Sequence, residues 1–76
     1  MPRTNVDQVE RQMRRFTDWL RGEMKRKKVT QRKLAEYLDI TQQALSLKMR
    51  GLSGWQLRDV LNICEYFEVS LEETIA

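Results

Sequence analysis

The sequence contains no histidine and only one cysteine, Cys64, among its 76 residues. Without histidine, the commonest acid–base group and metal ligand is missing. With one cysteine, the chain can form neither an internal disulfide nor a cysteine-rich zinc site. The remaining residues assemble no nucleophile–base pair and no metal-binding set, so we expect a protein that is not an enzyme and needs no cofactor.

Long hydrophobic runs are absent as well. No stretch approaches the roughly 18 apolar residues that a membrane-spanning helix requires, and the polar, charged N-terminus is unlike a signal peptide. We therefore expect a cytoplasmic protein with no membrane partner. The length is that of one small domain, which buries roughly 60% of its unfolded surface.

The charge is distributed unevenly along the chain. Residues 1–50 contain 13 Lys and Arg against 6 Asp and Glu, a balance of +7, whereas residues 51–76 contain 1 against 5, a balance of −4. A basic half of this kind is typical of a surface that meets a phosphate backbone. The acidic part is expected to lie away from nucleic acid or to meet a protein partner.

The N-terminal part divides into a short arm and a long helix. Residues 1–5 are predicted to be a flexible arm, in which Arg3 is either a DNA contact or part of a loose tail. Between Val6 and Lys27, apolar residues recur at steps of three and four, which predicts an amphipathic helix. This apolar seam consists of Val9, Met13, Phe16, Leu20 and Met24.

A run of four cations, residues 25–28, ends this predicted helix. Cations at a helix C-terminus complement the helix dipole, each contributing a few tenths of a kcal/mol. The same residues are also placed to contact phosphate. The two interpretations are compatible, and Lys28 is a candidate phosphate contact.

Residues 30–50 predict two short helices joined by a sharp turn. Thr30 and Thr41 are each placed to cap a helix N-terminus with a side-chain hydroxyl. Asp39 tolerates the positive φ of a tight turn, and Gly51 suits the position just after the second helix. This arrangement is a helix-turn-helix, which places its second helix in the major groove of DNA.

The second helix of this pair has two distinct faces. Leu45 and Met49 fall together on a helical wheel and predict the core side, with Lys48 beside them. The opposite side carries side chains suited to bases, because glutamine pairs with adenine and an apolar group meets the thymine methyl. The candidate base contacts are Gln42, Gln43, Ser46 and Leu47. The alternative is a solvated face with one exposed leucine.

Two further helices are predicted after Gly51. An apolar stripe marks the buried face of the first of them, over about residues 56–67. The stripe consists of Leu57, Val60, Leu61, Cys64 and Phe67. Cys64 is therefore expected to be a core residue. Ser70 and Glu73 form a capping box that begins the last helix. Trp55 is expected to pack on the core, with an indole–phosphate contact as the alternative.

These segments resemble the Cro/repressor type of helix-turn-helix domain, also called the XRE family. The resemblance covers about residues 13–76 and is carried by VTQRKLAEYLDITQQALSLKMRG (29–51) and WQLRDVLNICEYFEVSLEE (55–73). It implies an all-α, compact five-helix fold like that of lambda repressor, with residues 6–76 as the DNA-binding domain. Asp39 and Glu68 stand where the family often has glycine. Leu47 stands where many members carry a polar or basic residue.

The resemblance implies double-stranded DNA as the partner, and a transcriptional regulator as the function. The simplest mechanism is repression, with a homodimer bound to a pseudo-palindromic operator that overlaps a promoter, as in short phage regulators of the Cro type. The family counterpart of Gln31 contacts a phosphate and braces the first glutamine of the recognition helix, here Gln42. Further candidate phosphate contacts are Lys28, Arg32, Arg50 and Ser53, with the backbone amides of residues 52–54 beside them.

Two points stay open at the level of sequence. The same fold also serves antitoxins and protein-interaction modules, in which Gln43 and Leu47 would dock on a protein and the acidic end would suit a basic partner. The dimer surface is either the last helix or the long first helix. On the last helix, the candidates are Leu71, Thr74 and Ile75.

Overall fold

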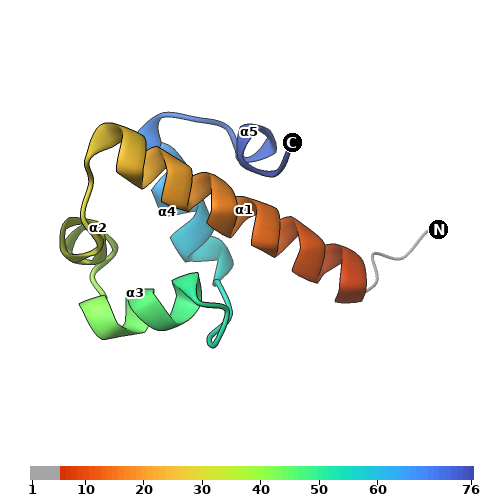
Figure 1. Ribbon diagram of the computed structural model, residues 1–76, viewed down its shortest axis with the longest axis horizontal. Coiled ribbons are helices and arrows are strands. Elements are labelled where there is room, and N and C mark those ends of the chain that lie inside the picture. The colour runs from red at the N-terminus through yellow and green to blue at the C-terminus, as the bar shows by residue number, and fades with distance from the viewer. Residues whose placement is uncertain (1–5) are drawn as a thin grey trace.

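The computed structural model describes residues 6–76, which fold into five helices (Figure 1). In chain order these are α1 (Val6–Lys27), α2 (Gln31–Leu38), α3 (Gln42–Met49), α4 (Leu57–Phe67) and α5 (Leu71–Ile75). The all-α, five-helix prediction is therefore confirmed. The predicted arm, residues 1–5 with Arg3, lies outside the described residues.

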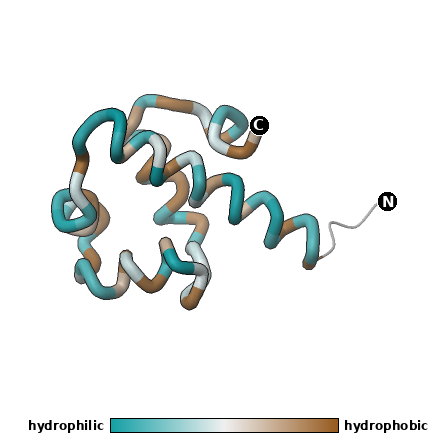
Figure 2. The backbone as a smooth tube through the Cα atoms, in the orientation of Figure 1, coloured by the Kyte–Doolittle hydropathy of each residue, from teal (hydrophilic) through white to brown (hydrophobic). Residues whose placement is uncertain are grey.

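Helix α1 crosses the whole molecule, and its N-terminal half extends beyond the other helices (Figure 1). Phe16, Leu20 and Met24 are buried, whereas Val9 is 43% exposed. The predicted apolar seam is therefore core only in its C-terminal part. Figure 2 shows α1 mostly in the hydrophilic colour, interrupted at intervals by hydrophobic residues, as expected for a helix that is buried along one stripe.

The predicted caps and turns are confirmed. The Thr30 hydroxyl accepts from the Lys33 amide at 3.1 Å, and the Thr41 hydroxyl accepts from the Ala44 amide at 3.0 Å. Asp39 ends α2 with a φ of 58°. Because the next helix starts only three residues later, α2 and α3 are held as an adjacent pair.

Left-handed backbone also ends two other helices. Lys28 after α1 has a φ of 56°, and Glu68 after α4 has a φ of 57°. In both turns the amide of the following residue donates to a carbonyl in the last turn of the helix, from Val29 to Met24 at 2.8 Å and from Val69 to Cys64 at 3.0 Å. These bonds pair carbonyls that a helix C-terminus otherwise leaves without a partner.

The hydrophobic core is one cluster to which α1, α2, α3 and α4 all contribute, with residues of α5 packed against it. Its fully buried large side chains are Phe16, Leu20, Leu34, Leu45 and Ile63. Aromatic contacts extend the cluster, since Trp19 meets the Phe67 ring edge-on at 5.6 Å between centroids. Burial of such side chains supplies most of the driving force for folding.

The predicted stripe of α4 is wrong in two positions. Leu57 and Leu61 are 69% and 49% exposed, whereas Ile63 is fully buried and Asp59 is only 2% exposed. The buried face therefore follows Asp59, Ile63 and Phe67 at steps of four, together with Val60 and Cys64. On this face Ile63 and Phe67 enter the core, and Asp59 makes an ion pair with α3 that is described below.

Helix α5 begins at the predicted capping box. The Ser70 amide donates to the Glu73 carboxylate at 2.8 Å, and the Glu73 amide donates to the Ser70 hydroxyl at 3.4 Å. Thr74 is buried, and its hydroxyl donates to the Leu71 carbonyl at 2.6 Å. Thr74 is thus wrong as a dimer-surface candidate, because its side chain is already covered. Leu71 and Ile75 are half-buried against the core.

Cys64 is a core residue, as predicted. It is 5% exposed, and burial raises the pKa of its thiol, with a smaller contribution from the negative charge of Glu73. The thiol therefore stays protonated at neutral pH, which is the unreactive form.

Candidate nucleic-acid interface

Helix α3 presents a glutamine-rich face to solvent. Leu45 and Met49 are buried, as the helical wheel predicted, while Gln42 and Gln43 in the first turn are exposed. Ser46 and Leu47, one turn further along, are half-buried. Leu47 was expected to be exposed, and this expectation is wrong in that its side chain is half-buried. Leu47 instead offers part of an apolar side chain beside the two exposed amides.

The chain after α3 folds back onto this helix. The Leu47 carbonyl accepts from the amides of Leu52 at 2.9 Å and Ser53 at 3.2 Å, and the Gly51 amide donates to the Lys48 carbonyl at 3.2 Å. Both bonds to Leu47 are made by its backbone carbonyl, so they hold the connection against the end of α3. Of the backbone amides expected to meet the DNA strand, those of Leu52 and Ser53 are therefore already bonded within the protein. The Ser53 side chain remains exposed.

A buried ion pair attaches α3 to α4. The Lys48 ammonium lies 3.2 Å from the Asp59 carboxylate and donates to the Gly54 carbonyl at 3.0 Å. The two side chains are 10% and 3% exposed. Sequence reasoning placed Lys48 beside the core face but missed its partner. The available signal was the spacing of Asp59, which lies four residues before Ile63 on the same helical face.

Arg21 of α1 attaches the other end of α3. Its guanidinium donates a hydrogen bond to the carbonyl of Met49, the last residue of α3. A cation at this place complements the negative end of the helix dipole. Sequence reasoning assigned Arg21 no role. Together with Lys48, it fixes the direction in which the exposed face of α3 points.

The candidate phosphate contacts lie around α2 and at the end of α3. Gln31, the first residue of α2, is half-buried, and Arg32 beside it is exposed with Glu36 3.8 Å away. Arg50 is exposed at the C-cap of α3, and Lys28 is exposed before α2. No hydrogen bond joins Gln31 to Gln42 within residues 6–76, so the expected brace stays a prediction for the DNA-bound protein.

The cationic run at the end of α1 is partly occupied within the protein. The Arg26 guanidinium donates to the buried Glu23 carboxylate at 3.0 Å, and the Lys27 ammonium lies 3.5 Å from the same carboxylate. These partners, Arg26 first, lower the pKa of Glu23. Lys27 also lies 5.7 Å from the centre of the Phe67 ring. Arg26 and Lys27 therefore serve the fold, whereas Lys28 remains a phosphate candidate.

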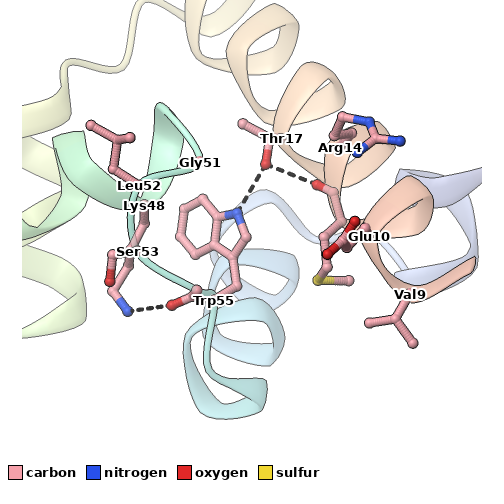
Figure 3. A pocket seen from close by; sticks show the side chains of 11 residues that line it. Val9, Glu10, Arg14, Thr17, Lys48, Gly51, Leu52, Ser53 and Trp55 are labelled. Atoms are coloured by element: carbon pink, nitrogen blue, oxygen red, sulfur yellow. Dashed lines mark hydrogen bonds between the residues drawn. The ribbon is translucent and has the colours of Figure 1, made fainter. Parts of the chain in front are cut away.

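Trp55 packs on the core as expected, and the alternative contact with phosphate is wrong. Its indole N–H donates to the Thr17 hydroxyl at 2.9 Å, and that hydroxyl donates to the Met13 carbonyl at 2.8 Å (Figure 3). The indole ring meets Phe16 edge-on, with 5.4 Å between centroids. The donor that a phosphate would need is therefore already bonded.

The described part of the chain holds no group of three or more His, Cys, Asp or Glu side chains arranged to hold a metal ion. Within the same residues, no helix combines the length and apolar character that crossing a membrane requires. What the geometry does provide is an anchored helix that exposes two glutamines in its first turn and an arginine at its C-cap.

A comparison with known families agrees with this geometry. The family of Cro/C1-type HTH DNA-binding domains matches residues 20–75, from the middle of α1 to the end of α5. The chain therefore belongs to this family of DNA-binding helix-turn-helix domains. No curated protein and no solved structure shows a significant match to the chain.

Proposed function

We propose that this member of the Cro/C1-type helix-turn-helix family is a sequence-specific transcriptional regulator that reads double-stranded DNA with α3. The observation that carries the proposal is the division of α3 into two faces. Leu45, Met49 and Lys48 fix the helix to the protein, while Gln42 and Gln43 leave their amide groups exposed. Side-chain amides held rigidly on a helix suit hydrogen bonds to base edges in the major groove.

Base and phosphate contacts are assigned to different residues. The proposed base contacts are Gln42, Gln43, Ser46 and Leu47. A half-buried leucine suits a thymine methyl better than a hydrogen-bonded base edge. The proposed phosphate contacts are Lys28, Gln31, Arg32, Arg50 and Ser53, with Arg3 of the arm as a further contact. Phosphate contacts hold the register, and base contacts supply the sequence preference.

The regulator acts as a homodimer in this proposal. Two copies of α3 enter successive major grooves, with half-sites about 10 bp apart in a pseudo-palindrome. The simplest way in which such a dimer represses transcription is to cover a promoter. We place this action in the cytoplasm of a bacterium or of a phage-infected cell, without catalysis and without a cofactor.

Selection from a random double-stranded DNA library tests the proposal directly. We expect enrichment of a short pseudo-palindrome, bound far more tightly than random DNA. Its affinity should fall steeply between two salt concentrations, because phosphate contacts release counterions. A Gln42→Ala/Gln43→Ala double variant is the control and should lose the preference while keeping general DNA affinity. Failure to enrich any sequence would contradict sequence-specific binding.

A protein partner is the second candidate function, as in an antitoxin. The observation that favours it is the net negative charge of residues 51–76, which contain five acidic residues and one basic residue. A basic protein would suit this region while α3 binds DNA or the same partner. Leu47→Ala separates the two functions, because it should weaken DNA binding if Leu47 meets a thymine and leave it unchanged if Leu47 docks on a protein.

A further inference from the structure

A groove between α1 and the segment after α3 lies next to the proposed DNA contacts. One part of it is a pocket of about 230 Å³. Its lining consists of Arg14, Thr17, Asp18, Arg21, Met49, Arg50 and Gly51. The neighbouring pocket, about 540 Å³, shares Arg14, Thr17 and Gly51 with it. Figure 3 shows Arg14 and Thr17 on α1, with Gly51 on the opposite side. The two pockets are therefore neighbours along the same side of α1.

Three arginines line the smaller pocket, together with one acidic residue, Asp18. Arg21 is held by the Met49 carbonyl, which uses one of its five N–H donors. The side chains of Arg14 and Arg50 make no hydrogen bond and no ion pair within residues 6–76. Positive charges gathered at one pocket repel each other. An anion bound between them is attracted to each and offsets this repulsion.

The pocket also lies in line with α3. Arg50 is the C-cap of this helix, and Arg21 bonds to its last carbonyl, so both residues mark the end of the helix that is proposed to enter the major groove. A DNA strand that borders the groove carries a phosphate every few ångströms. Arg14 of α1 lines the same pocket as Arg50, so a phosphate bound at the end of α3 would also lie close to α1.

We propose that Arg14 of α1, together with Arg21 and Arg50, forms a further binding site for a phosphate of the DNA backbone. Guanidinium groups suit this ligand because two N–H donors bond to two phosphate oxygens at once. The site extends the DNA contact from the helix-turn-helix onto α1, and Arg14 lies outside the residues that the family match covers. This inference rests on the proposed DNA-binding function and adds a contact to it.

Salt-dependent binding to a random-sequence duplex tests the site without knowledge of the operator. The probe is a fluorescein-labelled duplex of about two helical turns, titrated by anisotropy at several KCl concentrations. Removing one phosphate contact lowers the slope of log K against log salt by about 0.9, which corresponds to about eightfold weaker binding at 0.1 M salt. We expect this change for Arg14→Gln, while Arg14→Lys should keep most of the slope because the charge remains.

Arg11→Gln is the matched control. Arg11 is an exposed arginine of the same helix that lines neither pocket, so its loss changes net charge equally. The proposal requires a larger loss of slope for Arg14→Gln than for Arg11→Gln. Equal losses would overturn the Arg14 site while leaving DNA binding intact. If the unchanged protein does not bind DNA even at 0.05 M salt, the proposed function and the site both fail.

Discussion

The two faces of α3 are built in opposite ways. The inner face is attached to the rest of the protein. Leu45 and Met49 lie in the core, and Lys48 contacts both the Asp59 carboxylate and the Gly54 carbonyl. The outer face carries amides that make no bond within the described chain. The comparison shows that orientation and recognition are assigned to different side chains. Changes on the inner face should alter stability, and changes on the outer face should alter binding.

The largest effect should come from breaking the inner face at Asp59. Asp59→Ala leaves the Lys48 charge buried with only one carbonyl partner, which should reduce the free energy of unfolding by about 3–5 kcal/mol. Urea denaturation followed by circular dichroism measures this loss. The control replaces both partners, Lys48→Met with Asp59→Leu, and should recover most of the stability. A loss as large in the double variant would show that the pair acts through more than charge.

The outer face should respond in binding alone. Gln43→Ala should weaken binding to the selected operator by about 1–3 kcal/mol, because a base loses its hydrogen-bond partner. Its melting temperature should match that of the unchanged protein, since the side chain is exposed and unbonded. Gln12→Ala, an exposed glutamine of α1, serves as the control. Equal weakening of operator and random DNA by Gln43→Ala would remove Gln43 from the base contacts.

A smaller effect is expected where the segment after α3 meets α1. Trp55→Phe removes the hydrogen bond to the Thr17 hydroxyl but keeps an aromatic ring against Phe16. We expect a loss of about 0.5–1.5 kcal/mol in stability, the usual contribution of one such bond. The salt slope of DNA binding should stay unchanged, because the indole N–H faces Thr17. A lower salt slope for Trp55→Phe would instead indicate that the indole N–H contacts a phosphate.

The smallest effect concerns the pH dependence of Glu23. Its pKa in the folded protein is lowered from the ordinary value of 4.5 by Arg26 first and by Lys27 as well. The stability that these pairs contribute is therefore present above pH 4.5 and is lost as the pH falls below it. Helical pairs of this spacing contribute about 0.2–0.5 kcal/mol each. Glu23→Gln should flatten the acid side of the stability curve, measured by thermal melts between pH 3 and 7.

The features that the sequence predicted are those that depend on neighbours along the chain. Thr30, Thr41 and Ser70 each cap a helix through a bond to a residue three positions later, so the pattern is visible without any tertiary information. The same holds for the turn at Asp39 and for the glutamines at the start of α3. These local features were enough to identify the helix-turn-helix and the face that it exposes.

What sequence reasoning missed depends on contacts between distant segments. The Arg21–Met49 bond joins α1 to α3, and the Lys48–Asp59 pair joins α3 to α4. Helical spacing alone could not decide which side of α4 faces the core, because Leu61 and Ile63 lie on opposite sides of the helix and both are apolar. The choice is made by the partner across the interface. The bonds from the Leu52 and Ser53 amides to the Leu47 carbonyl likewise depend on how the segment after α3 folds back.

The left-handed turns at Lys28, Asp39 and Glu68 have a consequence for how the sequence can evolve. Left-handed backbone costs roughly 1–2 kcal/mol for most residues, less for aspartate, and nothing comparable for glycine. Replacement of Glu68 by glycine would therefore raise stability without removing a proposed DNA contact. Replacement of Lys28 by glycine would raise stability as well, but it would remove a proposed phosphate contact. Selection for thermal stability and selection for DNA affinity would thus oppose each other at Lys28 and act independently at Glu68.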